Sequence, residues 1–390
     1  MRVAILSYSS HALGGGVASV TRNLVEGLAD KVDLHVVCEK GAFQDSHARC
    51  YELPDLHIPH GSFLTIHMSA HNIVRTIEQI DPDIVHANYV HMLALVSHSI
   101  RKKRPLIVTA HAVPYRELQG LFQYPTFGWE FLAGFFLFPY WHLVDRDVLH
   151  DSDLAVAVSP LVRRDLIQIY HLSPQDIVVV PNAVDTSRFA PGKPGAVKNG
   201  KPNLLSVGRL VHSKGFAQLV RSMRTVCNEE KDVCLRIVGT GPEMHSLKRL
   251  AGNLGLTDNI VFLGHVSHDR LTVEYLNSDL VVVPSVYEPY SMVALEAMSC
   301  GKPVAMSNNV GIAELLPRES YVLIDPSNME STARSLVAAL RDPERLTELG
   351  RKGRLLAERE YSPEASAMRM IEVYESVLQK RTNTRQDSLH

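Results

Sequence analysis

Short, mostly apolar runs alternate in the first half of the chain with longer segments whose apolar residues recur at helical spacing. The strand-like runs are VAILSY, VDLHVV, DIVHANY, PLIVTAHA and LAVAVS. After the first of them, the segment from Val17 to Leu28 carries an apolar stripe of the kind that one face of a helix needs. Apolar strands separated by helices are typical of a parallel sheet covered on both faces, so residues 1–190 are predicted to form a doubly wound α/β domain.

The same alternation begins again at residue 203. Its runs are LLSVGRL, LRIVGTG, IVFLG, LVVVPS, PVAMS and YVLID, again with helix-period segments between them. Residues 191–202 are rich in proline, glycine and lysine and have no periodicity, which is typical of an interdomain linker. We therefore expect a second Rossmann-like domain over residues 203–362. Such sheets bind ligands at the carboxyl ends of their strands, so two facing domains would place binding loops on both walls of a central cleft.

Composition narrows the class of protein without naming a partner. The 390 residues are 45% hydrophobic and 21% charged, which excludes disordered and fibrous proteins and suits two domains with separate cores. The formal net charge is only -2, so no overall field favours nucleic acid, and no such partner is expected. Five cysteines, an odd number without a CxxC pair, indicate a reducing compartment. The first apolar run is too short for a signal peptide, so a cytoplasmic protein that is not exported is expected.

The stretch 279–303, DLVVVPSVYEPYSMVALEAMSCGKP, predicts a buried strand, a loop and a helix in that order. Glu288 precedes a proline, which disfavours the helical conformation at Glu288, whereas proline suits the first position of a helix. The helix is therefore expected to begin at Pro289 or Tyr290. It is expected to end near Cys300, because the glycine that follows suits the position after a helix.

This arrangement separates two carboxylates by a helix N-terminus. Glu288 lies in the loop above the strand, and Glu296 lies about 10 Å further along the helix at ~1.5 Å per residue. One carboxylate could accept hydrogen bonds from sugar hydroxyls and the other from ribose hydroxyls. Between them, the first amides of the expected helix, those of Ser291, Met292 and Val293, would form a seat for a phosphate.

Here the sequence resembles a known family. In EPYSMVALEAMSCGKPV, seven residues separate Glu288 from Glu296, as in the Glu-x7-Glu signature of the retaining glycosyltransferases of family 4. The resemblance covers nearly the whole chain, and residues 363–380 are similar to the terminal helix that crosses back onto the first domain. It implies the GT-B fold and retaining transfer of a sugar from a nucleotide diphosphate donor, such as a UDP- or GDP-sugar, to form an α-linkage. No further cofactor is expected.

Two cations on one strand-end loop fit a diphosphate. Gly208 and Arg209 end the first strand of the second domain, and Lys214 opens the next helix. Arginine can bind two phosphate oxygens with its fork, while lysine acts as a compact charge. In the family that these residues resemble, such cations stabilise the leaving diphosphate. The alternative is that they are ordinary solvated surface charges.

Two further loops of the second domain match the family less specifically. Gly239, in IVGTGPEMHSL, is expected to serve the geometry of a turn more than to touch the donor. The stretch VFLGHVSH resembles the segment whose backbone meets the nucleotide base, which places His265 and Val266 near that base. Ser291 stands where glycine is usual, and Val310 and Gly311 replace a glycine pair, so the identity of the sugar stays open.

In the first domain, the resemblance implies acceptor binding, with a glycan, a glycolipid or a small molecule as the acceptor. Gly15 and Gly16 lie in a loop before a helix, where glycine allows close approach to a phosphate or to the acceptor, although a plain turn is an equal alternative. His111 ends a strand and matches the histidine that contacts the donor sugar in relatives.

Residues 121–142, LFQYPTFGWEFLAGFFLFPYWH, hold both tryptophans around a run of phenylalanines. One hypothesis makes this segment a core helix with a packed aromatic face. The other makes it an apolar lip that touches a membrane at its inner face and admits an amphipathic acceptor. The segment is too short and too interrupted to span a membrane.

No metal site is predicted. Three D-x-D triplets, at residues 81–83, 145–147 and 151–153, resemble the metal motif of another glycosyltransferase fold. The first leads into a strand and the others surround a helix end, so a metal is not expected at any of them.

Two other functions remain open at this point. A sugar-nucleotide epimerase of the same fold would interconvert the donor without an acceptor. A catalytically inactive scaffold would keep the fold and bind a partner, although the joint presence of Arg209, Lys214, Glu288 and Glu296 argues against it.

Overall fold

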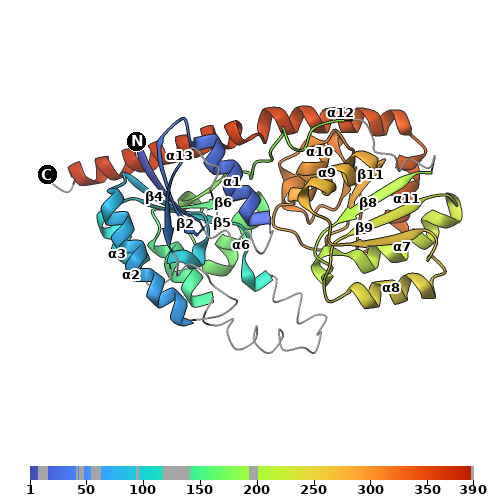
Figure 1. Cartoon of the computed structure of the whole chain (residues 1–390), viewed down its shortest axis with the longest axis horizontal. Coiled ribbons are helices and arrows are strands. Elements are labelled where there is room, and N and C mark those ends of the chain that lie inside the picture. Colours follow the sequence, from blue (N-terminus) through green and yellow to red (C-terminus); the bar gives the residue numbers. More distant parts are fainter. Residues whose placement is uncertain are drawn as a thin grey trace. The chain divides into compact units, whose positions relative to one another are not determined.

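The computed structural model describes residues 1–7, 16–40, 43, 48–53, 63–93, 96–116, 140, 142–192 and 201–387 (Figure 1). Contacts within the chain divide it into two compact units. Unit 1 contains Met1–Ala183 together with Pro363–His390, and unit 2 contains Val184–Ser362.

Unit 1 is built on a parallel sheet whose strand order is β3-β2-β1-β4-β5-β6-β7. The strands are β1 (Arg2–Ser7), β2 (Asp33–Glu39), β3 (Arg49–Leu53), β4 (Ile84–Ala87), β5 (Leu106–Ala110), β6 (Leu154–Ala157) and β7 (Ile177–Val179). The helices are α1 (Gly16–Leu28), α2 (Phe63–Ile80), η3 (Val90–Leu93), α3 (Ser97–Lys103), α6 (Pro160–Tyr170), η4 (Pro174–Asp176) and α13 (Pro363–Asp387). The strand order reverses between β1 and β4, and open sheets of this type bind ligands beside such a point.

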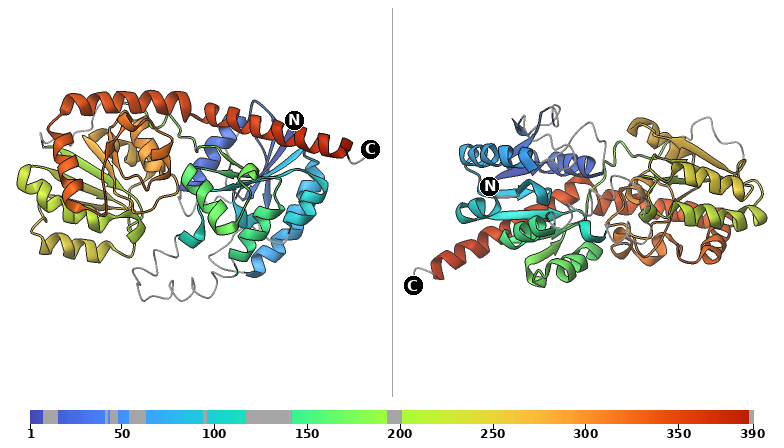
Figure 2. Two further views of the ribbon diagram at one scale, coloured as in Figure 1. Left: turned by 180° about the vertical axis from the view of Figure 1, so that it is seen from behind. Right: turned by 90° about the horizontal axis from the view of Figure 1, so that it is seen from below.

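The last helix, α13, belongs to unit 1 although it follows unit 2 in the sequence. Tyr374 and Ala367 on α13 are fully buried in the same cluster as Leu28 of α1 and the centre of the sheet. A side chain at Gly27 of α1 would place its Cβ 2.2 Å from the carbonyl oxygen of Pro363, so only glycine allows the two helices to approach here. Both views in Figure 2 show α13 lying along unit 1.

A buried histidine joins α13 to the sheet. The Nδ1 atom of His86, on β4, lies 2.7 Å from the hydroxyl of Tyr374, and its Nε2 atom lies 2.7 Å from the Oγ1 atom of Thr109 on β5. Burial lowers the pKa of His86 to about 3. The folded chain therefore keeps this ring neutral at pH values where a histidine in the unfolded chain is already protonated.

The buried ring of His86 should make the protein sensitive to acid. Because the unfolded chain binds the extra proton, stability is lost as the pH falls from about 6.5 toward 3, by about 1.4 kcal/mol per pH unit. We expect the free energy of unfolding in urea to fall more steeply between pH 7 and pH 5 for the wild type than for His86→Gln, whose amide can hydrogen-bond without titrating. Other groups titrate in both proteins, so the difference between the two slopes isolates His86. Equal slopes would contradict the neutral, buried assignment.

Unit 2 contains a second parallel sheet, in the order β10-β9-β8-β11-β12-β13. Its strands are β8 (Asn203–Val207), β9 (Cys234–Val238), β10 (Ile260–Gly264), β11 (Leu280–Val283), β12 (Val304–Met306) and β13 (Val322–Leu323). Its helices are η5 (His212–Lys214), α7 (Phe216–Glu229), α8 (Met244–Asn253), α9 (His268–Asn277), α10 (Met292–Ser299), η6 (Gly311–Glu314), η7 (Arg318–Ser320), α11 (Met329–Leu340) and α12 (Pro343–Glu360). This is the Rossmann strand order, with its reversal between β8 and β11.

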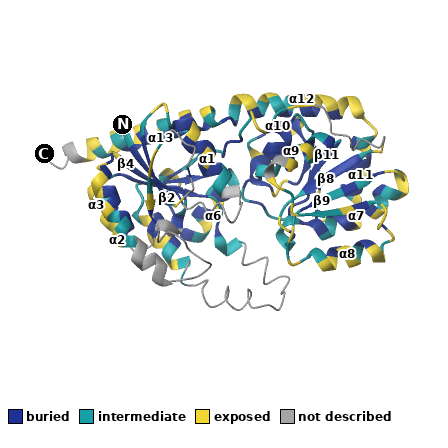
Figure 3. Ribbon diagram, viewed as in Figure 1, coloured by how far each residue is buried: buried dark blue, intermediate teal, exposed yellow. Residues whose placement is uncertain are grey.

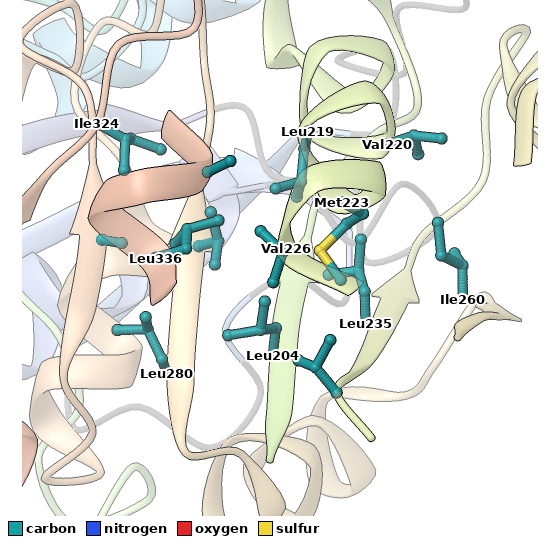
Figure 4. Packing of buried hydrophobic residues seen from close by; sticks show 14 of the residues in the cluster. Leu204, Leu219, Val220, Met223, Val226, Leu235, Ile260, Leu280, Ile324 and Leu336 are labelled. Carbon is teal, nitrogen blue, oxygen red and sulfur yellow. The ribbon is translucent and has the colours of Figure 1, made fainter. Parts of the chain in front are cut away.

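The core of unit 2 explains why its strands read as continuous apolar runs. Leu204, Leu235 and Leu280, from three neighbouring strands, are fully buried against Met223 of α7 and Leu336 of α11 (Figure 4). Buried residues fill the central strands of the sheet, while exposed residues lie mainly on the outer faces of the helices and on loops (Figure 3). Helices cover both faces of the sheet, so no strand needs alternating polar positions.

The boundary between the units falls earlier than the sequence predicts. Residues 184–190, expected in the first domain, belong to unit 2 because that unit supplies their hydrogen bonds. The amide of Val184 donates to the carbonyl of Tyr361 at 2.9 Å, and the hydroxyl of Ser299 donates to the carbonyl of Phe189 at 2.6 Å. Such long-range contacts leave no signal in the local composition.

Candidate functional site

Most residues that the sequence singles out lie on loops at the carboxyl ends of the unit 2 strands. All six strands of that sheet are parallel, so their carboxyl ends share one edge. The loop after β8 carries Arg209 and Lys214, and the loop after β11 carries Glu288. These two strands pair with each other where the strand order reverses, which is the position where sheets of this type bind ligands.

Backbone hydrogen bonds connect three of these loops. The carbonyl of Ser213, after β8, accepts from the amide of Val286, after β11, at 2.9 Å. Glu288 donates its amide to the carbonyl of Asn309, after β12, at 3.0 Å, and its carbonyl accepts from Gly311 at 2.9 Å. The backbone on both sides of Lys214 and Glu288 is therefore held in place before any ligand binds.

Two glycines allow the loops to pack this closely. Gly215 has φ 70°, and a Cβ there would lie 2.0 Å from the carbonyl oxygen of Pro284. Gly239 has φ 134°, and a Cβ there would lie 1.9 Å from the carbonyl oxygen of Gly208. Gly239 thus has a structural reason to be glycine, as the sequence predicts, and its contact with a donor stays a prediction.

Glu288 and Lys214 form an ion pair at the edge of the sheet. The Nζ atom of Lys214 lies 2.9 Å from Oε1 of Glu288, and the hydroxyl of Ser285 donates to Oε2 at 2.6 Å. Glu288 is only 7% exposed, so its carboxylate is oriented and largely desolvated. Each carboxylate oxygen has further lone-pair capacity, so a ligand hydroxyl can still donate to it.

Arg209 is in the opposite situation. Its side chain is exposed, and among the described residues no hydrogen bond or ion pair is recorded for it. A guanidinium presents up to five N–H donors in a planar fork. Arg209 can therefore bind an anion without first breaking a bond within the protein.

The helix that follows Glu288 begins later than the sequence predicts. The expected start at Pro289 or Tyr290 is wrong, since α10 begins at Met292. The carbonyl of Tyr290 accepts instead from the amide of Ile312 at 3.0 Å, which keeps this residue out of the helix. Ser291 is the N-cap, so the helix presents the amides of Met292 and Val293 and not that of Ser291 as its first turn.

Ser291 has an unusual backbone for a residue with a side chain. Its φ of 93° lies in the region that favours glycine, and its hydroxyl accepts a hydrogen bond from the amide of Ala294 at 3.3 Å. The end of α10 is as predicted, with Cys300 as the C-cap and Gly301 at φ 70°.

Glu296 lies within α10 and is buried, at 6% exposure. Its Oε2 atom accepts a hydrogen bond of 2.7 Å from the hydroxyl of Tyr275, on α9. Burial raises the pKa of Glu296 to about 7, although the Tyr275 hydrogen bond works in the other direction. Near neutral pH this carboxyl can therefore both donate and accept, which suits recognition of hydroxyls; its contact with a ribose stays a prediction.

The proposed base-binding stretch follows β10. Val266 is half-buried and His265 is exposed. The carbonyl of Gly264 accepts from the amide of Gly239 at 2.8 Å, which connects this loop to the one after β9. The backbone of the stretch is thus anchored next to Gly208 and Gly239, while contact with a base stays a prediction.

In unit 1, His111 follows β5 and is partly exposed. Its Nε2 atom lies 3.1 Å from the carbonyl oxygen of Asn88, which follows β4. Gly16 is the first residue of α1, and Gly15 lies outside the described residues.

The aromatic segment 121–142 also lies outside the described residues, apart from Tyr140 and His142. None of the described helices is both long enough and apolar enough to cross a bilayer. In the described ranges, no three His, Cys, Asp or Glu side chains are placed to hold a metal ion, and metal independence stays a prediction.

Sequence reasoning missed three residues that support the site. Tyr275 lies at an ordinary apolar position of an amphipathic helix, and Ser285 lies in a loop. Nothing near either residue in the sequence indicates a role in the site. Asn88 could have been found, because it directly follows a buried strand, as His111 does.

Two family models match the chain, one over each half. The model described as Glycosyltransferase Family 4 matches residues 14–188, and the one described as Glycosyl transferases group 1 matches residues 192–356.

Curated relatives are glycosyltransferases. A D-inositol 3-phosphate glycosyltransferase from Segniliparus rotundus is 32% identical over 248 residues, which cover 60% of this chain and 54% of the relative. An uncharacterized glycosyltransferase from Methanocaldococcus jannaschii is 30% identical over 212 residues, which cover 52% of this chain and 54% of the relative. The chain thus spans about half the length of these relatives, 54% of each.

Solved structures share the fold over nearly the whole chain. Sucrose-phosphate synthase from Thermosynechococcus elongatus has a TM-score of 0.74 at 23% identity, covering 97% of this chain and 99% of that one. Anabaena HepE in complex with UDP-glucose has a TM-score of 0.74 at 19% identity, covering 96% and 100%. The two parallel-sheet α/β units have the GT-B fold.

Proposed function

Because the chain belongs to the family 4 (group 1) glycosyltransferases, we propose that it moves a sugar from a nucleotide diphosphate donor to an acceptor hydroxyl. One observation carries the proposal: the exposed Arg209 and the Lys214–Glu288 ion pair occupy connected loops beside the N-terminus of α10. The alternative of a scaffold gives no reason for an oriented carboxylate and an available guanidinium at one sheet edge.

In this proposal, the donor diphosphate binds Arg209, Lys214 and the amides of Met292 and Val293. As the bond from the anomeric carbon to the phosphate oxygen breaks, its electron pair goes to the diphosphate, and these cations and amides stabilise the growing charge. Glu288 accepts hydrogen bonds from sugar hydroxyls, and Glu296 accepts from the ribose. The backbone of Gly208, Gly239 and Val266 lines the nucleotide.

The new bond forms between the anomeric carbon and the acceptor oxygen on the face that the diphosphate leaves. The acceptor proton passes to the departing diphosphate, so no protein base is consumed. The family implies retention, and hence an α-linkage from an α-linked donor. No side chain at the sheet edge is assigned as a nucleophile, which is in keeping with attack on the same face.

The donor and acceptor are proposed by class. Anabaena HepE, which shares the fold, was solved in complex with UDP-glucose, so UDP-sugars are the first donors to test. Unit 1 is proposed to bind the acceptor, a glycan, a glycolipid or a small molecule. The membrane hypothesis for residues 121–142 makes lipid-linked acceptors part of the test.

A panel of UDP- and GDP-sugars, each with water-soluble and lipid-linked acceptors, tests the proposal by mass spectrometry. We expect one donor to yield equal amounts of nucleoside diphosphate and glycosylated acceptor. Interconversion of the donor without an acceptor would support an epimerase instead. If every donor and acceptor of the panel stays unmodified, the result would support an inactive scaffold.

A further inference from the structure

A buried polar network surrounds His111 at the carboxyl ends of β4 and β5. The Nε2 atom of His111 lies 3.1 Å from the carbonyl oxygen of Asn88 and 3.3 Å from Oδ1 of the same residue. The Nδ2 atom of Asn88 donates to the Oγ1 atom of Thr21, on α1, at 2.7 Å. Asn88 is 2% exposed and Thr21 is fully buried, so water does not compete for these bonds.

This network decides which nitrogen of His111 carries the proton. The backbone carbonyl of Asn88 can only accept, and its Oδ1 atom also accepts, because Nδ2 is used to donate to Thr21. A ring nitrogen that faces two acceptors must be the protonated one. The carbonyl alone requires this, whichever way the Asn88 amide is oriented.

The other ring nitrogen, Nδ1, then carries a lone pair. His111 is partly exposed, and no hydrogen bond of Nδ1 is recorded within the described part of the chain. Desolvation lowers the pKa of His111 to about 4, so the ring is neutral at pH 7. A neutral ring with the proton on Nε2 can accept a hydrogen bond at Nδ1 but cannot donate one there.

We propose that Asn88 is a positioning residue that holds His111 as the Nε2–H tautomer, so that Nδ1 accepts a hydrogen bond from a substrate hydroxyl. The inference rests on the proposed function for placing His111 at the substrate. It goes further in assigning the direction of the bond: His111 selects a hydroxyl donor and does not bind a phosphate or carbonyl oxygen.

The tautomer can be measured without substrate or turnover. Long-range proton–nitrogen NMR spectra of protein labelled with 15N-histidine distinguish the two tautomers, and the His111 signals are assigned by their loss in His111→Phe. We expect a neutral ring with the proton on Nε2 at pH 7. A ring protonated on Nδ1 would overturn the inference, whether or not the protein transfers sugars.

The role of Asn88 is tested by Asn88→Asp, which keeps the shape and places a carboxylate beside Nε2. A carboxylate at this distance should raise the pKa of His111 by at least about one unit in an NMR titration, so that Nδ1 gains its proton at a higher pH than in the wild type. The matched control is Asn23→Asp, since Asn23 is another buried asparagine of unit 1, but it donates to the carbonyl of Ala183 at 2.8 Å. The His111 signals should not move in the control. An unchanged pKa of His111 in Asn88→Asp, with folding confirmed by circular dichroism, would overturn the role of the Asn88 side chain and leave the tautomer to the backbone carbonyl alone.

Once the donor is known, substrate analogues test the direction of the bond. Deoxy and fluoro analogues are compared at each sugar hydroxyl, because fluorine can accept weakly but cannot donate. At one hydroxyl we expect both analogues to lose kcat/KM by about tenfold in the wild type. In His111→Phe, neither analogue should have a lower kcat/KM than the unmodified sugar. A fluoro analogue that keeps full activity where the deoxy analogue fails would show that His111 donates, and would overturn the inference while leaving the transfer function intact.

Discussion

Arg209→Ala is expected to lower turnover by about two orders of magnitude or more, with almost no change in the free energy of unfolding. The reason is that the side chain of Arg209 is exposed and makes no hydrogen bond or ion pair with the described residues, so it contributes little to folding. In the proposed mechanism its charge acts on the departing diphosphate, where stabilisation appears only in the transition state. Steady-state kinetics and urea unfolding on the same preparation measure the two effects.

The matched control is Arg224→Ala, because Arg224 is also exposed but lies within α7, away from the first turn. It should keep wild-type turnover. Arg209→Lys should fall between the two, since lysine restores the charge without the fork. Wild-type turnover in Arg209→Ala would remove this residue from the site.

Lys214 is less suited to such a test than its sequence position suggests. The sequence around Lys214 predicts a surface cation whose removal lowers the free energy of unfolding only slightly. In the structure it is the partner of a buried carboxylate, so Lys214→Ala would also leave Glu288 unpaired and destabilise the loop. Reduced turnover in that variant could therefore come from the lost charge or from the destabilised loop, and the experiment would not separate the two.

Glu288→Gln is expected to lower turnover by about 100-fold or more, since the proposed contact with sugar hydroxyls needs the carboxylate that Lys214 and Ser285 hold in place. An amide keeps the volume but offers one acceptor oxygen instead of two. The free energy of unfolding should fall by only about 1 kcal/mol, because Lys214 is partly exposed and can be solvated. Kinetics with the identified donor, together with urea unfolding, measure both quantities.

A second ion pair of unit 2 supplies the control. The side chain of Glu274 is 12% exposed, compared with 9% for that of Glu288, and its Oε2 atom lies 2.7 Å from Nη2 of Arg236. Glu274→Gln breaks this ion pair, whose carboxylate is about as buried as that of Glu288 but lies on α9, outside the strand-end loops. Turnover should survive there. Equal losses in Glu274→Gln and Glu288→Gln would mean that both act through stability, and the sugar-contact assignment would fall.

The strands of unit 2 could be predicted because their apolar runs are continuous and those at the centre of the sheet are buried on both faces, and all six runs of the second half became strands. In unit 1, β3 and β7 were not singled out: β3 is mostly exposed and has no continuous apolar run, and β7 is a strand of three residues at the edge of the sheet. Local chemistry also placed the end of α10, where a glycine follows the last turn.

The start of α10 could not be predicted in the same way. Proline favours a helix start at residue 289, but hydrogen bonds between residues 288–290 and a distant loop outweigh that preference. The carbonyl of Asn309 accepts from this segment, and the amides of Gly311 and Ile312 donate to it. These partners are about twenty residues away in the sequence, too far for a local pattern to reveal. The hydrogen bond between Tyr275 and Glu296 also joins residues that are far apart in the sequence, so no local pattern reveals it. The roles expected for the site residues came from the family resemblance and not from local sequence rules.

The most direct test of sugar transfer is a proton NMR time course of the donor and acceptor identified by the panel, run with wild type and with Arg209→Ala. We predict that the anomeric signal of the α-linked donor is replaced by that of an α-linked product, with one nucleoside diphosphate released per linkage, and that Arg209→Ala slows this conversion severely. Consumption of the donor without a new glycosidic linkage, or the same rate in both proteins, would contradict transfer at this site.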